Sequence, residues 1–195
     1  MKFVIGLVLG LILVPLGCYL YFASGKAPVA TTDSAMPFEE FLAGKALSAR
    51  ITKDAPKDVP IQPSEANYLA AAELYKQHCA VCHGVPLSSK TAIASGMYPQ
   101  PPRLLEGTGV TDDEPGETYW KIFNGIRLTG MPGFSKSLSE TQMWQIALLM
   151  KNADKLPASV KQALVTPIGA TSTTNMPQVS PVPPPPAFPA MTPAK

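Results

Sequence analysis

Two cysteines and a histidine near the middle of the chain, Cys79, Cys82 and His83, constrain its fold more than any other feature. Their spacing makes the C-x-x-C-H pattern that is typical of covalent haem c attachment. If the chain is helical into Cys79, both sulfurs project toward one edge of a porphyrin and can form thioethers with its two vinyl groups. His83 then falls next to the iron, and its imidazole is predicted to supply the proximal ligand.

Two other interpretations of this cluster stay open as weaker alternatives. A redox-active disulfide between Cys79 and Cys82 would be expected near a βαβ pattern, which the chain lacks. A structural zinc site usually draws its four ligands from two separated pairs. Here His78, Cys79, Cys82 and His83 all come from one turn, and the chain has no further histidine.

A haem that only transfers electrons needs a second axial ligand, and Met131 is the predicted one. His78 is adjacent to the attachment site and cannot reach the opposite haem face, which leaves the methionines. Met131 lies in a segment that Gly130, Pro132 and Gly133 mark as a loop. A thioether on a loop between helices can face the iron.

The other methionines are given different roles. Met97 follows too closely after His83 for an easy return to the far haem face. Met143 and Met150 lie seven residues apart on the apolar face of a predicted helix, where methionine usually fills gaps in a core. The remaining candidates lie in the linker and the tail: Met36, Met176 and Met191.

At this point the chain resembles the class I c-type cytochromes, which have a monohaem cytochrome c domain, over about residues 64–156. The segment 68–75 is similar to the family's first helix, with the aromatic Tyr75 four residues ahead of Cys79. Residues 101–104 are similar to the family's Pro-x-Leu segment. Residues 119–132 are similar to its helix, turn and methionine loop.

The resemblance implies an all-α fold, a small helical domain wrapped around one haem. It also implies that the carbonyl of Pro102 accepts a hydrogen bond from His83. Ser139 to Gln142 form a predicted capping box, with Leu138 and Met143 as a hydrophobic staple. In the family the helix that starts there crosses the first one, so Trp144 and Leu148 are expected to pack on Ala71 and Tyr75.

Two arginines are candidates to bind the haem propionates. The guanidinium groups of Arg103 and Arg127 suit carboxylates, although both side chains could equally be solvated. The predicted haem-binding residues are therefore Cys79, Cys82, His83, Pro102, Arg103 and Arg127, with His83 and Met131 as iron ligands. An electron carrier requires no catalytic residue, and none is predicted.

The N-terminus carries an uncharged apolar run, Phe3 to Ala23, which is about as long as a helix needs to be to cross a membrane, roughly 20 residues. A cleaved signal peptide is the alternative, but its apolar region should be shorter and end in an A-x-A-like site. A retained anchor is favoured. Cys18 follows Pro-Leu-Gly and so resembles a lipoprotein cleavage site, yet apolar residues continue past it, and lipidation is the weaker interpretation.

Composition divides the rest of the chain. Proline is concentrated in the segment from Pro28 to Pro63 and after Pro167. We therefore expect an anchor at 1–25, a linker with a short helix near 38–51 at 26–63, a cytochrome c domain at 64–157, and a disordered Pro-rich tail at 158–195. The tail is expected to serve as a spacer or as a docking strip for an aromatic-lined partner.

The charge and the motifs together favour one-electron transfer. The net charge of +2 argues against nucleic-acid binding, which normally needs a basic patch. We expect a periplasmic haem domain anchored in the inner membrane, which exchanges electrons with redox partner proteins and uses no small-molecule substrate. The alternatives are a haem c subunit of a larger membrane dehydrogenase or oxidase, and a five-coordinate haem sensor or peroxidase-like enzyme.

Overall fold

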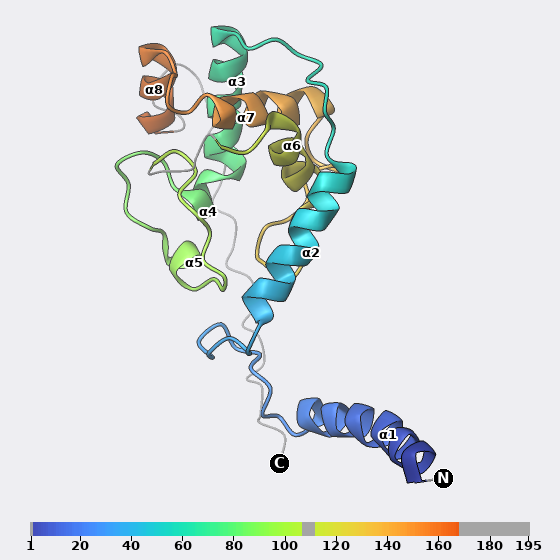
Figure 1. The fold of residues 1–195 in the computed structure, drawn as a ribbon. Coiled ribbons are helices and arrows are strands. Elements are labelled where there is room, and N and C mark those ends of the chain that lie inside the picture. Colours follow the sequence, from blue (N-terminus) through green and yellow to red (C-terminus); the bar gives the residue numbers. More distant parts are fainter. Residues whose placement is uncertain (1, 107–111, 168–195) are drawn as a thin grey trace.

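A computed structural model describes residues 2–106 and 112–167 of the 195-residue chain. Within these residues the secondary structure is helical, with no strands, and this confirms the all-α prediction. The helices are α1 (Lys2–Ala23), α2 (Glu39–Asp54), α3 (Glu65–His78), α4 (Ala80–His83), α5 (Ala92–Ser95), α6 (Pro115–Asn124), α7 (Glu140–Lys151) and α8 (Ala158–Val165) (Figure 1). The predicted tail from residue 168 onward lies outside the described residues.

The hydrophobic core forms where α7 packs against both α3 and α6. Both α3 and α7 begin at a serine whose side chain accepts a hydrogen bond from a backbone N–H of the first turn, Ser64 from Asn67 and Ser139 from Gln142. The Gln142 side chain also accepts from the backbone of Ser139, so the predicted capping box is confirmed.

The expected crossing of the first and last helices is also present. Ala71, Tyr75, Trp144 and Leu148 are all buried in one hydrophobic cluster. The Trp144 ring additionally stacks on Tyr119 of α6, with ring centroids 4.3 Å apart and planes within 14°. Aromatic stacking of this kind adds to the area that the rings bury, so Trp144 links all three helices.

Helix α8 corrects the predicted domain boundary. Residues 158–165 were expected in a disordered tail, but they form a helix that packs against α3. Val160 and Leu164, one turn apart, are almost completely buried in the same cluster as α7. The globular domain therefore extends past residue 157, because this apolar pair covers a face of α3 that would otherwise be exposed.

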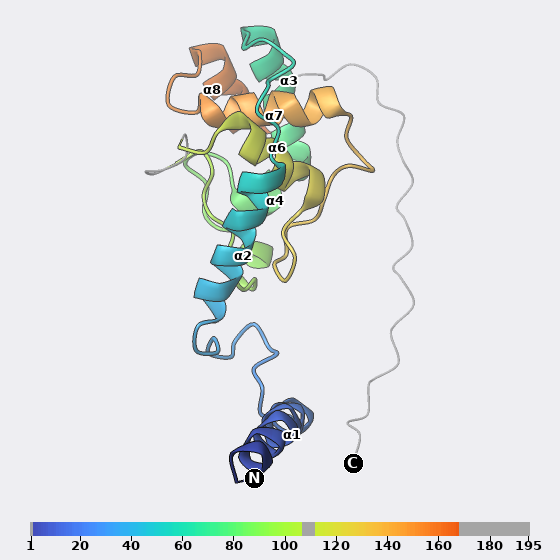
Figure 2. The same ribbon diagram turned by 45° about the vertical axis from the view of Figure 1, so that its right-hand side comes forward.

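Helix α2 covers a second side of the domain (Figure 2). It ends at Asp54, three residues beyond the predicted short helix, and its single buried residue, Ile51, lies near that end. The chain then contacts α6 at Gly116, where an added β-carbon would overlap the carbonyl of Pro56. The second half of the predicted linker is thus part of the packed structure.

Helix α1 stands apart from the packed helices in both views (Figures 1 and 2). It has no buried residue, and it is long and apolar enough to cross a membrane. At 1.5 Å per residue its 22 residues span about 33 Å, close to the roughly 30 Å of a hydrocarbon core. By length and composition α1 fits a membrane anchor, and a signal sequence would meet the same test.

Candidate functional site

The C-x-x-C-H residues lie where α3 is followed directly by α4: Cys79 is the junction between the two helices, and Cys82 and His83 lie in α4. The backbone N–H of Cys79 donates to Tyr75 O of α3 at 2.8 Å, and Cys79 O accepts from the N–H groups of Cys82 and His83 at 3.1 and 2.9 Å. This turn holds both cysteines and the histidine in one short helical segment. Cys79 and Cys82 are free thiols and half-buried. Burial, with a smaller effect of the neighbouring Cys82, raises the pKa of the Cys79 thiol to about 12.

His83 is oriented by a backbone carbonyl from a different segment. Its Nδ1 lies 2.8 Å from Pro102 O, the pair that the cytochrome resemblance implies. Because a carbonyl oxygen can only accept, Nδ1 carries the proton and Nε2 is left with its lone pair. Burial lowers the pKa of His83, against the opposing effect of the Pro102 carbonyl, and so favours the neutral imidazole. A neutral imidazole with one nitrogen fixed in this way is the form that binds iron.

The attachment turn is fixed to α3 by a buried hydrogen bond. The hydroxyl of Tyr75 donates to Gly84 O at 2.7 Å. Gly84 has φ +73°, and an added β-carbon would overlap the guanidinium of Arg103. Glycine is therefore favoured at this position by its backbone angle, and a β-carbon would in addition force the Arg103 guanidinium to move.

Arg103 supports the residues that follow the haem motif. Its guanidinium donates to Val85 O at 2.8 Å and forms an ion pair with Glu106 at 2.8 Å. A haem propionate that bound Arg103 would have to share its guanidinium with the carboxylate of Glu106. Arg127 is exposed in the turn that leads from α6 toward Met131. The predicted propionate contacts of both arginines stay predictions.

Met131 lies in a compact loop after α6. Its carbonyl accepts from Ile126 N at 3.1 Å, and its own N–H donates to the Thr129 hydroxyl, also at 3.1 Å. The N–H of Phe134 donates to Ile122 O at 2.9 Å, which returns the chain to α6. The Met131 side chain is half-buried and packs against the core cluster. These contacts fix the backbone of the loop that carries the thioether, and ligation of iron by Met131 stays a prediction.

His78 and Met97 both lie against this loop. The His78 ring makes an edge contact with Phe134, with centroids 6.0 Å apart, which gives it a packing role. Met97 differs from its sequence prediction, because the structure brings the end of its side chain onto Gly130, the residue before Met131. Sequence spacing missed this neighbour, since the approach depends on how the chain folds back between residues 91 and 102.

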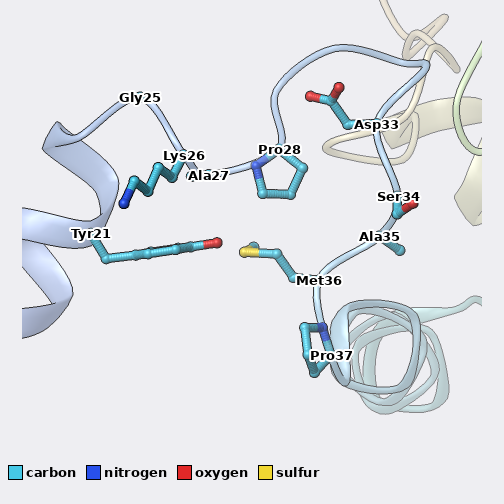
Figure 3. Close-up of a pocket in the computed structure, with 10 residues that line it drawn as sticks. All are labelled: Tyr21, Gly25, Lys26, Ala27, Pro28, Asp33, Ser34, Ala35, Met36 and Pro37. Carbon is cyan, nitrogen blue, oxygen red and sulfur yellow. The ribbon is translucent and has the colours of Figure 1, made fainter.

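The zinc alternative gains no support from the structure. Among the described residues, no three or more His, Cys, Asp and Glu side chains form a group able to hold a metal ion. A surface hollow of about 420 Å³ lies elsewhere, between the end of α1 and the start of α2, with Tyr21 and Met36 on its walls (Figure 3). It contains none of the predicted haem residues.

Comparison with known proteins identifies the same segment. The sequence model of a family described as cytochrome c oxidase, cbb3-type, subunit III, matches residues 66–150. No curated protein matches the chain. Among solved structures, one chain of the Kuenenia stuttgartiensis reducing HAO-like protein complex is similar, at 25% identity and a TM-score of 0.43. The match covers 52% of our chain and 52% of that chain, so only about half of that structure's length is represented.

The residues of the site fit a haem c. Cys79 and Cys82 provide two free thiols. The neutral imidazole of His83 has its Nδ1 hydrogen-bonded, so its Nε2 is available to bind iron. The thioether of Met131 lies in a compact loop. The family match spans the attachment turn and the methionine loop together. Residues 66–150 are therefore a monohaem c-type cytochrome domain, which carries covalently bound haem c with its iron.

Proposed function

We propose that the chain is a membrane-anchored electron carrier that passes single electrons between redox partner proteins on the periplasmic side of the inner membrane. A haem c electron-transfer role follows from the domain itself. The anchor is supported by the length and apolar character of α1 and by its separation from the packed helices. Lys2, before the span, favours a cytoplasmic N-terminus, which leaves the haem domain on the other side.

In this proposal Cys79 and Cys82 form the two thioethers, and His83 and Met131 are the iron ligands. When bound, haem c supplies one-electron exchange at its iron, and a His/Met ligand pair raises the reduction potential. Pro102 fixes the tautomer of His83 through the 2.8 Å contact with Nδ1. The loop hydrogen bonds of Met131 fix the backbone that carries its thioether. A thioether bound to the iron would keep outside molecules from the sixth position.

The observation that carries the proposal is that the same domain holds an oriented neutral imidazole at His83 and a methionine, Met131, in a hydrogen-bonded loop. An iron with both axial positions filled by the protein transfers electrons and does not bind substrates. The test is the optical spectrum of the purified, reduced protein before and after addition of carbon monoxide. An unchanged spectrum is expected. Rapid binding of carbon monoxide would favour the sensor or peroxidase-like alternative instead.

A second candidate function is a haem c subunit of a larger membrane oxidase or dehydrogenase. It is favoured by the description of the matched family as a subunit of a cytochrome c oxidase. Purification from membranes in mild detergent separates the two functions. A lone chain supports a tethered carrier, whereas a larger partner present in constant ratio supports the complex.

A further inference from the structure

One side chain outside the predicted ligand set lies against the methionine loop. Met97 is half-buried, and its Cε methyl lies so close to Gly130 that an added β-carbon at Gly130 would overlap it. Gly130 directly precedes Met131. The end of the Met97 side chain therefore contacts the backbone directly before the predicted sixth ligand.

Met97 belongs to a segment that is fixed to the opposite side of the site. Before Met97, the Thr91 hydroxyl donates to Val81 O, inside the C-x-x-C-H turn, at 2.6 Å. Thr91 also caps α5, which packs against α4. After Met97, the chain reaches Pro102, whose carbonyl lies 2.8 Å from Nδ1 of His83. The segment 91–102 is thus held near the proximal ligand at both ends.

In the loop that carries Met131, Gly130 leaves room for the end of the Met97 side chain. Gly130 has no side chain, and the Met97 methyl occupies the space where one would be. The neighbouring loop backbone is already engaged, since the N–H of Met131 donates to Thr129 and its carbonyl accepts from Ile126. Met97 therefore contacts a loop whose backbone is also held by its own hydrogen bonds.

We propose that Met97 is a positioning residue that holds the Met131 loop against the haem and so couples the sixth ligand to the segment that orients His83. This inference rests on the proposed ligation by His83 and Met131. The thioether of Met97 is suited to the task because an unbranched methionine side chain fills an irregular gap between two backbones. Its role requires the volume of the side chain and not its sulfur.

The test uses the full-length holoprotein with Met97→Ala and Met97→Leu. Met97→Ala removes the contact, and it should weaken the charge-transfer band from the methionine sulfur to the iron in the optical spectrum of the ferric protein. The midpoint potential should fall. The fraction of reduced protein that binds carbon monoxide should rise by about tenfold, because a contact that supports the ligand loop is lost. Met97→Leu keeps most of the volume and should restore all three measurements. Met150→Leu, in the core of α7, is the matched control and should behave like wild type.

A double-mutant cycle with Gly130→Ala tests the contact itself. In the presence of Met97 the added methyl displaces the thioether end, so Gly130→Ala should weaken the band. In the Met97→Ala background the space is vacant, and the same change should have a smaller effect. Additive effects would overturn the proposal. If Met97→Ala incorporates haem poorly, Gly130→Ala in the otherwise wild-type protein still tests the contact, and an unchanged band there would overturn the proposal.

Three outcomes separate this inference from the proposed ligation. If Met131→Ala leaves the band intact, the ligand assignment itself is wrong. If Met131→Ala abolishes the band while Met97→Ala resembles wild type, only the positioning role fails. If Met97→Leu loses the band as completely as Met97→Ala, the sulfur is required, and Met97 is a ligand and not a positioning residue.

Discussion

The hydroxyl of Tyr75 donates a 2.7 Å hydrogen bond to the carbonyl oxygen of Gly84, across the whole haem attachment turn. Tyr75 is completely buried in the core, and Gly84 is the residue directly after His83. One bond thus closes the turn that holds both cysteines and the proximal histidine. Burial raises the pKa of Tyr75 above its usual range, so the hydroxyl stays protonated and able to donate.

Tyr75→Phe should lower the free energy of unfolding of the holoprotein by about 1–3 kcal/mol, because the buried carbonyl of Gly84 would be left without a hydrogen-bond donor. Chemical denaturation followed by circular dichroism measures the change. Tyr119→Phe is the control, since Tyr119 contributes its ring to the stack with Trp144 and should cost less. Equal losses in the two variants would mean that the Tyr75 hydroxyl has no special role.

Covalent haem attachment should depend on both cysteines of the attachment turn. A Cys79→Ala, Cys82→Ala double variant should lose most haem staining on denaturing gels, because no sulfur remains to form a thioether. Cys18→Ala should stain like wild type, since Cys18 lies in α1. Full staining of the double variant would refute the site. If Cys18→Ala released the protein from membranes, the lipoprotein interpretation would replace the helical anchor.

Met131→Ala should retain covalent haem but open the iron to carbon monoxide. The midpoint potential should fall at the same time, because the thioether that raises it is gone. Optical spectroscopy should also show loss of the methionine-to-iron band in the ferric protein. Met143→Leu serves as the control, because Met143 is buried in α7 and Leu conserves its volume. Loss of the band in Met143→Leu but not in Met131→Ala would move the ligand to α7.

Helix α8 should contribute measurably to the stability of the haem domain. Leu164→Ala should lower the free energy of unfolding by about 2–5 kcal/mol, because it leaves a cavity against α3. Val165→Ala, next to it but exposed, should cost no more than about 0.5 kcal/mol. Thermal or chemical denaturation of the two variants compares them directly. Similar stabilities would show that α8 does not pack in solution.

The proposed topology predicts that protease added to intact spheroplasts digests the domain after α1. A truncation that starts near Ala27, behind a cleavable signal, should give a soluble red protein, since the packed residues begin only in α2. Protection of the haem domain in spheroplasts would reverse the topology. A membrane-bound truncation would show that α1 is not what holds the protein there.

The sequence predicted those parts of the molecule that depend on local spacing. The C-x-x-C-H turn, the Ser139 capping box and the loop around Met131 are each set by residues a few positions apart. The contact of Met97 with Gly130 was missed because it depends on the path of the whole segment 91–102. Helix α8 was missed because two buried residues, Val160 and Leu164, are a weak periodic signal next to a Pro-rich stretch.

If α1 anchors the chain as proposed, the contact between Gly116 and Pro56 shortens the tether between the membrane and the haem. With α2 and the chain after it docked on α6, only the 15 residues from 24 to 38 remain to connect α1 with the domain. Fully extended they span about 50 Å, and as a flexible coil they average about 20 Å. In the proposed membrane-anchored carrier, electron exchange would be limited to partners within reach of this tether, which would keep the local concentration of the haem near the membrane high.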